Sequence, residues 1–313
     1  MTAVVGRWLT EPVPRGRVAA FRSLVYAFVA ADLVVFTPWV RAHANVPGEL
    51  YRPLLAGRLL HLPVPTPLLV NALFWALLGA SLAAATGRAP RALGWAVFLG
   101  YAEWMIIAMS YGKVDHDRFG LLVALAVLPT AGPARHGETA LTERGGWALR
   151  ATQLAVVATY LLSAVAKLRF GGIEWLTGAT LTRAAVRRGT ALVNPLVGLP
   201  GALTVTQFAI VAFELTSPLV FVLPRRARYL MIAGWYAFHL IVFATITIAF
   251  LPHQVAMASF LPLERVRLIR GRRGQGRGQG RGEAAHSGNP HPVRGRWPSR
   301  VITSDRRLWI WPR

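Results

Sequence analysis

The chain has 313 residues, of which 54% are hydrophobic and only 15% are charged. Ordinary soluble domains carry about 25% charged residues, so the composition excludes that class of protein. The absence of cysteine excludes disulfide frameworks, thiolate metal sites and iron–sulfur clusters. The formal net charge of +22 does not predict a nucleic-acid partner, because 13 of the 35 Lys and Arg residues follow Glu264 and the others punctuate apolar runs.

Several apolar runs reach the length of about 20 residues that a membrane-spanning helix requires. Six runs are clear, and they lie at 18–38, 67–86, 92–111, 147–167, 203–224 and 227–250. A seventh run at 119–132 is too short unless its helix begins earlier, and an eighth at 250–263 is short and contains Pro252 and His253. The sequence therefore predicts an all-α fold, a polytopic integral membrane bundle of seven or eight spans.

The segments between and after these runs have other predicted roles. Residues 41–67 are polar and rich in proline, so we expect a loop with a short surface helix. Residues 169–189 place Trp175 and three arginines on different sides of a predicted interfacial helix. The membrane domain is predicted to cover 1–264. The tail at 265–313 contains GRRGQGRGQGRG and is predicted to be disordered, because it has almost nothing to bury.

The tail also bears on orientation. Its 13 arginines favour a cytoplasmic C-terminus, which requires an even number of crossings and so favours eight. We expect the tail either to be solvated or to contact anionic lipid headgroups. No cleavable signal peptide is evident, so the first run should stay as an anchor in a plasma membrane. The strong preference for arginine over lysine is typical of a high-GC bacterial genome.

Chemistry is expected at ionisable residues placed at membrane depth, because each is costly there and faces a partner or a cavity. These residues are Arg22, Asp32, Glu103, Asp115, His116, Asp117, Lys167, Glu214 and His239. Successive spans alternate in direction, so the start of the fourth and the end of the fifth share a membrane face. Lys167 and the Asp115–His116 pair are therefore predicted at one face, and Asp32 in the same half.

Lys167 stands out, because only it and Lys113 are lysines among the 35 Lys and Arg residues. Arginine does not release its proton in a protein, whereas a desolvated lysine does, so a position that needs a base cannot accept arginine. The alternative is that Lys167 merely extends from its helix end to the headgroups. Glu214 and His239 have a similar alternative, namely hydrogen bonds that hold helices together.

Motifs of several other classes are missing from the sequence. It contains no Gly-rich phosphate loop, no nucleophile elbow and no paired-histidine zinc helix. No metal is therefore expected, and nucleotide-binding or soluble hydrolase functions are not predicted.

From about Val18 to Leu263 the chain resembles the HTTM domain proteins, bacterial membrane relatives of vitamin K-dependent gamma-carboxylase. The motifs that carry the resemblance are FRSLVYAFVAADL, GKVDHDRFGLLVALAVL, YLLSAVAKLRFGGIEWLTGATL, and FELTSPLVFVL followed by YAFHLIVFATI. The third motif is the most specific. In the carboxylase, oxygenation of a quinol drives proton abstraction from a peptide glutamate, and carbon dioxide is then captured.

The resemblance implies roles for particular residues of this chain. It places Lys167 where the carboxylase has the lysine that deprotonates the hydroquinone. It places His116 and His239 near histidines that would hold the quinol oxygen. Around these three candidate catalytic residues, the candidate residues for binding substrate or cofactor are Asp115, Glu214, Asp32 and Trp175. The large peptide-recruiting domain of the carboxylase has no counterpart here, which leaves the acceptor of the chemistry open.

Three functions remain open at this point. The first is a quinol-dependent carboxylase or oxygenase, with a vitamin K or menaquinol type of cofactor and carbon dioxide as a co-substrate. The second is a permease or a lipid-handling protein that binds a solute in the same charged cavity. The third is a membrane scaffold whose buried charges only pair helices.

Overall fold

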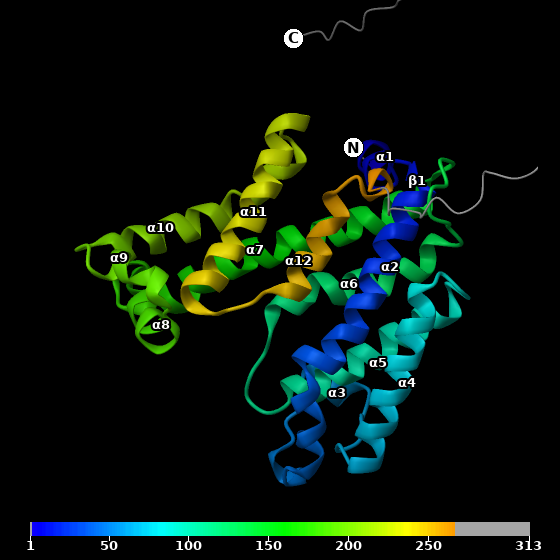
Figure 1. Ribbon diagram of the computed structural model, residues 1–313, viewed down its shortest axis with the longest axis horizontal. Helices are drawn as coiled ribbons and strands as arrows, with labels where there is room; N and C mark the ends of the chain where they lie inside the picture. The colour runs from blue at the N-terminus through cyan, green and yellow to red at the C-terminus, as the bar shows by residue number, and fades with distance from the viewer. Residues whose placement is uncertain (1, 267–313) are drawn as a thin grey trace, which may run out of the picture. The chain divides into compact units, whose positions relative to one another are not determined.

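The computed structural model describes residues 2–266, and these are mostly helical (Figure 1). The helices are α1 (Thr2–Leu9), α2 (Arg15–Ala31), α3 (Leu55–Leu59), α4 (Pro67–Ala85), α5 (Ala92–Met109), α6 (Phe119–Val127), α7 (Glu143–Thr177), α8 (Thr180–Arg188), α9 (Asn194–Val197), α10 (Ala202–Leu215), α11 (Arg225–Ile246) and α12 (Leu251–Met257). Strands β1 (Val13–Pro14) and β2 (Leu141–Thr142) form an antiparallel pair. The predicted helical fold is confirmed.

Short turns of 3-10 or π-helix extend or connect these helices. They are Asp32–Phe36, Pro38–Asn45, Gly48–Leu50, His116–Arg118, Leu128–Ala131, Ala191–Val193, Ser217–Phe221, Ala258–Phe260 and Leu263–Arg265. Helix starts are set locally in two clear cases. Thr66 accepts a hydrogen bond from the Leu69 N–H ahead of Pro67, and Thr142 does the same for Gly145.

Five of the described helices are long and apolar enough to cross a membrane. They are Arg15–Phe36, Pro67–Ala85, Ala92–Met109, Glu143–Thr177 and Arg225–Ile246, and a sixth span results if the bent pair Ala191–Val197 and Ala202–Leu215 counts as one. These helices fit an integral membrane protein.

The predicted count of seven or eight spans is higher than this number and stays a prediction. The difference arises at prolines. Pro218 follows the end of α10 within the predicted run 203–224, Pro129 follows α6, and Pro252 lies in the first turn of α12. Each therefore leaves a helix shorter than the apolar run that contains it.

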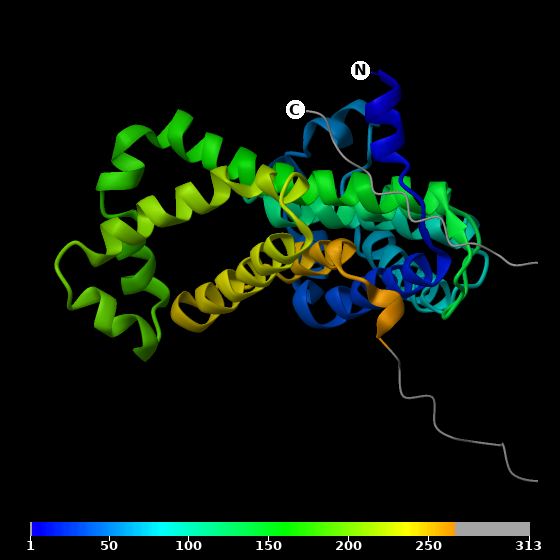
Figure 2. The same ribbon diagram turned by 90° about the horizontal axis from the view of Figure 1, so that it is seen from above.

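The helices pack around two large cores that α7 joins, and a small third cluster of Ala164, Leu176 and Val211 links α7 to α10. Figures 1 and 2 show how these helices are arranged. The first core lies among α2, α4, α5, α6 and the beginning of α7, and it contains Phe21, Tyr101 and Leu125. The second lies among the middle of α7, α11 and α12, and it contains Val156 and Trp235. Helix α10 packs along the later part of α7, so the end of α7 forms one wall of the space beside the second core.

Contacts between distant segments define the two ends of the bundle. At one end the β1–β2 pair joins the starts of α2 and α7, and Arg17 donates two hydrogen bonds of 2.8 Å to Glu264. At the other end Asp32 pairs with Arg118 at 2.7 Å. The start of α2 and residue 264 therefore lie at the same end.

The segments predicted to lie outside the spans contain short helices. The loop at 41–67 holds α3, and the region 169–189 holds the end of α7 and all of α8. On α8 the side chains of Arg183, Arg187 and Arg188 are exposed. The predicted disordered tail lies outside the described residues, apart from its first two positions, and so does its predicted contact with lipid.

Candidate functional site

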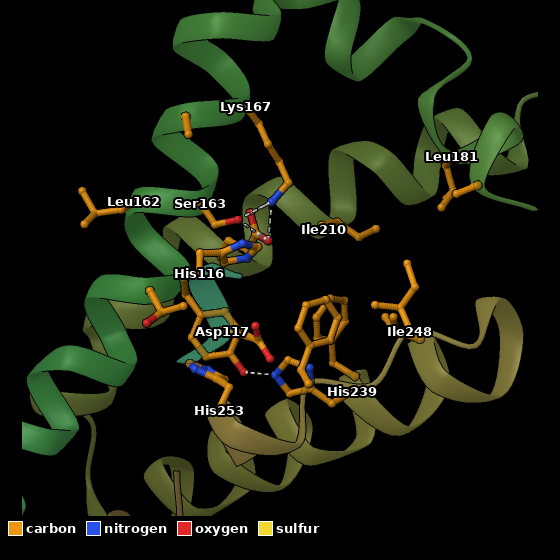
Figure 3. A pocket seen from close by; sticks show the side chains of 18 of the residues that line it. His116, Asp117, Leu162, Ser163, Lys167, Leu181, Ile210, His239, Ile248 and His253 are labelled. Carbon is orange, nitrogen blue, oxygen red and sulfur yellow. Dashed lines mark hydrogen bonds and ion pairs between the residues drawn. The ribbon is translucent and has the colours of Figure 1, made fainter. Parts of the chain in front are cut away.

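A cavity of about 620 Å³ lies between α7, α8, α10, α11 and the segment that leads into α12 (Figure 3). We call it the Lys167 cavity. Its wall is mostly apolar and includes Leu162, Ile210 and Ile248. A few polar groups interrupt this wall, and they come from segments far apart in sequence. An apolar cavity with a few converging polar groups is the usual form of a small-molecule site.

Lys167 and Glu214 form an ion pair at the wall of this cavity. The Lys167 Nζ atom lies 2.6 Å and 2.7 Å from the two carboxylate oxygens, and 2.7 Å from the Ser163 Oγ. Ser163 is one helical turn before Lys167 on α7, whereas Glu214 comes from α10. The lysine side chain is 19% exposed and the carboxylate 8%. The amine therefore faces the cavity more openly than the carboxylate behind it.

A break in α7 brings Trp175 back toward this ion pair. Gly172 has φ +58°, a backbone conformation that residues with a Cβ rarely adopt. Beyond this point the chain folds back, and the Lys167 Nζ lies 5.3 Å from the centre of the Trp175 ring. At that distance the ring interacts favourably with a cation.

The connection between α7 and α8 is held by one buried side chain from α10. The Gln207 amide nitrogen donates to the carbonyls of Trp175, Leu176 and Gly178 at 2.7–3.1 Å. Its carbonyl oxygen accepts from the Leu181 N–H at 2.7 Å. Gln207 thereby satisfies backbone groups that the helix ends leave free, and it fixes this side of the cavity.

Aromatic and imidazole rings form the opposite wall. The Tyr160 hydroxyl and the His239 Nε2 are 2.7 Å apart, and the centre of the His253 ring lies 4.7 Å from that of Tyr160. Within the described part of the chain, His239 Nδ1 and both ring nitrogens of His253 are buried without a hydrogen-bond partner. A buried nitrogen without a hydrogen-bond partner lowers the stability of the fold, so these nitrogens favour the binding of a polar ligand.

His116 and Asp117 reach the cavity from the turn that precedes α6. Burial, followed by the charge of Lys167, lowers the pKa of His116. Burial raises the pKa of Asp117 to about 6, and Asp115 adds to this rise while Arg118 opposes it. Burial therefore favours the neutral form of both groups.

Two of the predicted binding residues lie elsewhere. Asp32 is fully buried in its ion pair with Arg118, and Asp115 pairs with Lys113 at 2.8 Å. Neither lines the Lys167 cavity. Both line a neighbouring pocket of about 470 Å³ that shares His116 and Asp117 with it. Among residues 2–266, no group of three or more histidines or acidic residues is placed to hold a metal ion.

The structure thus brings five predicted residues together in one cavity, namely His116, Lys167, Trp175, Glu214 and His239. Sequence reasoning missed four others, namely Tyr160, Ser163, Gln207 and His253. Tyr160 and Ser163 had a signal, because they precede Lys167 by seven and four residues and so share its helix face. Gln207 and His253 had none, since their contacts come only from tertiary packing.

Comparison of the chain with protein-family models, with curated proteins and with solved structures gives no match.

Proposed function

We propose that the Lys167 cavity binds a quinol-type ligand and that the Lys167–Glu214 pair removes a proton from its hydroxyl. The observation that carries this proposal is the ion pair of 2.6 Å that faces a cavity of about 620 Å³ with a largely apolar wall. A ligand for such a site has a flat or branched apolar body and at least one polar oxygen. A quinol has both.

The residues present fit a quinol. The wall of aromatic and aliphatic side chains accommodates a ring and an isoprenoid chain. Buried imidazole nitrogens of His239 and His253 lack partners among the described residues, and a quinol oxygen is able to supply one. Trp175 offers a ring face beside the amine.

The proton transfer follows from the geometry of the pair. At 2.6 Å, the ammonium proton of Lys167 is able to pass to Glu214, which leaves a neutral amine facing the cavity. The amine then accepts the proton of a ligand hydroxyl, and the restored ammonium stabilises the oxyanion that forms. Ser163 holds the amine in place at 2.7 Å. The bound quinol would supply the reducing power for a reaction with dioxygen.

The resemblance to the HTTM domain proteins supports the same proposal, since it assigns the base to Lys167 and quinol contacts to His116 and His239. We therefore propose membership of that family, and a quinol-dependent oxygenase or carboxylase activity. Carbon dioxide is the proposed co-substrate for the carboxylase form. The acceptor stays open.

We also propose that the chain crosses a plasma membrane eight times. The eight proposed spans are Arg15–Phe36, α4, α5, Phe119–Ala131, α7, α10 with its following turn, α11, and Leu251–Phe260. The ion pair between Arg17 and Glu264 supports an even number of membrane crossings, because it holds the beginning of the first segment beside the end of the last. The arginine-rich tail then favours the cytoplasm at that end.

The first test is mass spectrometry of the small molecules that copurify with the protein in mild detergent. Wild type should retain a quinone enriched over bulk lipid, and Lys167→Ala should lose it. Lys113→Ala is the matched control, because Lys113 is the other lysine of the chain and its side chain is 77% exposed. Bulk lipid alone in all three samples would contradict the quinol proposal and favour a lipid-handling function.

The second test separates the base from its charge. Lys167→Arg keeps a cation beside Glu214 but loses the ability to become neutral, so quinol oxidation should fall at least about 100-fold. Lys113→Arg should leave it unchanged. Quinol oxidation retained in a correctly folded Lys167→Arg protein would refute the role of the lysine as a base.

A further inference from the structure

A separate pocket lies at the other end of the bundle from the Lys167 cavity. It measures about 370 Å³ and lies among the beginnings of α2, α7 and α11 and residues 11–14. Arg150 on its wall precedes Lys167 by 17 residues on α7, which corresponds to about 25 Å along a helix. The pocket shares no lining residue with the Lys167 cavity. We call it the arginine pocket.

Four arginines line this pocket, namely Arg17, Arg150, Arg225 and Arg228. The first two have acidic partners. Arg17 makes two hydrogen bonds of 2.8 Å to Glu264, and Arg150 lies 2.9 Å from Glu11. Within residues 2–266, the structure gives Arg225 and Arg228 no acidic partner. The pocket therefore carries two positive charges that its described neighbours do not neutralise.

Arg228 also keeps unused hydrogen-bonding capacity. One of its terminal nitrogens donates to the Leu223 carbonyl at 3.2 Å. Its Nε is buried and has no partner in the described part of the chain. A guanidinium carries five N–H donors in a planar fork that matches phosphate and carboxylate oxygens. An oxyanion in the pocket would satisfy this donor and offset the charge together.

The beginning of α11 also favours a bound anion. Arg225 is its first residue, no acidic residue lies in its first turn, and Pro224 provides no side-chain cap. Cations at the N-terminus of a helix repel the positive end of its dipole, whereas an anion there is stabilised.

A third guanidinium is fixed at the pocket wall by an aromatic ring. The Arg150 guanidinium carbon lies 4.4 Å from the centre of the Trp8 ring.

We infer that the arginine pocket binds a phosphate group, with Arg225 and Arg228 as its charged donors. Phosphate accepts several N–H bonds at once and carries more charge than a carboxylate, so it matches two guanidinium groups that lack an acidic partner among residues 2–266. Phe221 and Phe260 line the same pocket and offer an apolar surface beside the phosphate. A lipid headgroup and a free phosphate share this chemistry.

The test measures binding of two probes to the full chain in detergent. The probes are inorganic phosphate and detergent-solubilised phosphatidylglycerol, with phosphatidylcholine as reference. The test variant is Arg225→Gln/Arg228→Gln. Its matched control is Arg226→Gln, because Arg226 lies in the same helical turn but does not line the pocket. Wild type and Arg226→Gln should bind at least one probe, and the double variant at least tenfold more weakly.

The two sources give different patterns. Phosphatidylglycerol retained through purification and not displaced by inorganic phosphate assigns the site to a lipid headgroup. Saturable binding of inorganic phosphate, with a rise in the melting temperature of wild type but not of the double variant, assigns it to a free phosphate. Equal loss in Arg226→Gln, or no binding of either probe by wild type, would overturn the inference.

A second double variant separates the effect of charge from that of the guanidinium geometry. Arg225→Lys/Arg228→Lys keeps both charges and loses the planar fork, so it should bind more weakly than wild type and more tightly than the glutamine variant. Binding that is equal in the lysine and glutamine variants would show that charge at this site plays no part.

Discussion

The described part of this protein contains two buried ion pairs that differ in their surroundings. Asp32 and Arg118 lie 2.7 Å apart, and Tyr101 and Thr37 both donate to the same carboxylate oxygen, at 3.0 and 3.2 Å. Lys167 and Glu214 lie 2.6 Å apart, with Ser163 as the hydrogen-bonded neighbour. We call the first the enclosed pair, because its carboxylate is fully buried although the pair borders the neighbouring pocket of about 470 Å³. We call the second the open pair, because its lysine side chain is 19% exposed and faces the Lys167 cavity.

Under the proposed function, this difference separates a structural pair from a reactive one. The Asp32 side chain is fully buried, so its partners lock it, and breaking it leaves an uncompensated charge. The Lys167 side chain retains contact with open space, so a ligand is able to reach it and exchange a proton. An ionisable residue at membrane depth therefore does not define a site by its type alone. A ligand must also be able to reach it.

The largest expected effect comes from breaking the enclosed pair. Asp32→Asn should lower the stability of the folded protein by about 3–5 kcal/mol, because it leaves the charge of Arg118 buried without a counter-ion. Thermal unfolding in detergent measures this loss.

Two further variants sharpen this test. Lys113→Met breaks an ion pair whose lysine is 77% exposed, and it should change stability by less than about 1 kcal/mol. Asp32→Leu/Arg118→Leu should recover much of the loss, since it removes both charges. An Asp32→Asn protein as stable as wild type would mean that the enclosed pair does not hold together the helices around the first core.

Breaking the open pair should reduce activity more than stability. Glu214→Gln removes the proton acceptor behind Lys167, so quinol oxidation should fall at least about 100-fold. Stability should fall by less than in Asp32→Asn, because the open pair is less completely buried than the enclosed pair.

The matched control is Glu103→Gln, since Glu103 is also a carboxylate within a predicted span but does not line the cavity. It should oxidise quinol at the wild-type rate. A larger loss of stability in Glu214→Gln than in Asp32→Asn would reverse the comparison between the two pairs.

The last of these effects concerns Asp117, which lines both the Lys167 cavity and the neighbouring pocket. Its pKa rises from 3.8 to about 6 on burial, with Asp115 raising it further and Arg118 and Lys113 opposing. Because the folded protein favours the neutral form, this group contributes stability below about pH 4 that is lost as pH rises through about 6. The loss at pH 7 amounts to about 3 kcal/mol, because each pKa unit corresponds to about 1.4 kcal/mol.

Asp117→Asn should therefore raise the melting temperature at pH 7 and flatten its dependence on pH between 4 and 6. Measuring both proteins at pH 4, 5, 6 and 7 tests this. Equal slopes in the two proteins would show that Asp117 does not cause the dependence.

Much of the fold was predictable because apolar length and proline placement are local properties. The runs at 18–38, 67–86 and 92–111 correspond closely to three of the long apolar helices. The run at 203–224 is where the prediction was too simple, since Pro218 divides it and α10 ends at Leu215. Alternation of direction also explains why His116 and Lys167 share a cavity.

The candidate site was predictable only in part. Lys167 and Glu214 were chosen as costly residues at membrane depth, but nothing in the sequence showed that they pair with each other. Asp32 met the same criterion and proved to belong to an enclosed pair with Arg118. In both ion pairs the two partners lie on different helical segments, and a single sequence does not show which of these segments pack against each other.

The sequence by itself determined the class of this molecule, an apolar helical chain with costly charges at a few depths, because hydrophobic length and residue type are set residue by residue. Only the tertiary structure decided which charges meet and which remain open. The fold of α7 at Gly172, the bonds of Gln207 and the meeting of Tyr160 with His239 and His253 all depend on contacts between distant segments. Those contacts follow from how the helices pack together, and packing is a property of the whole chain.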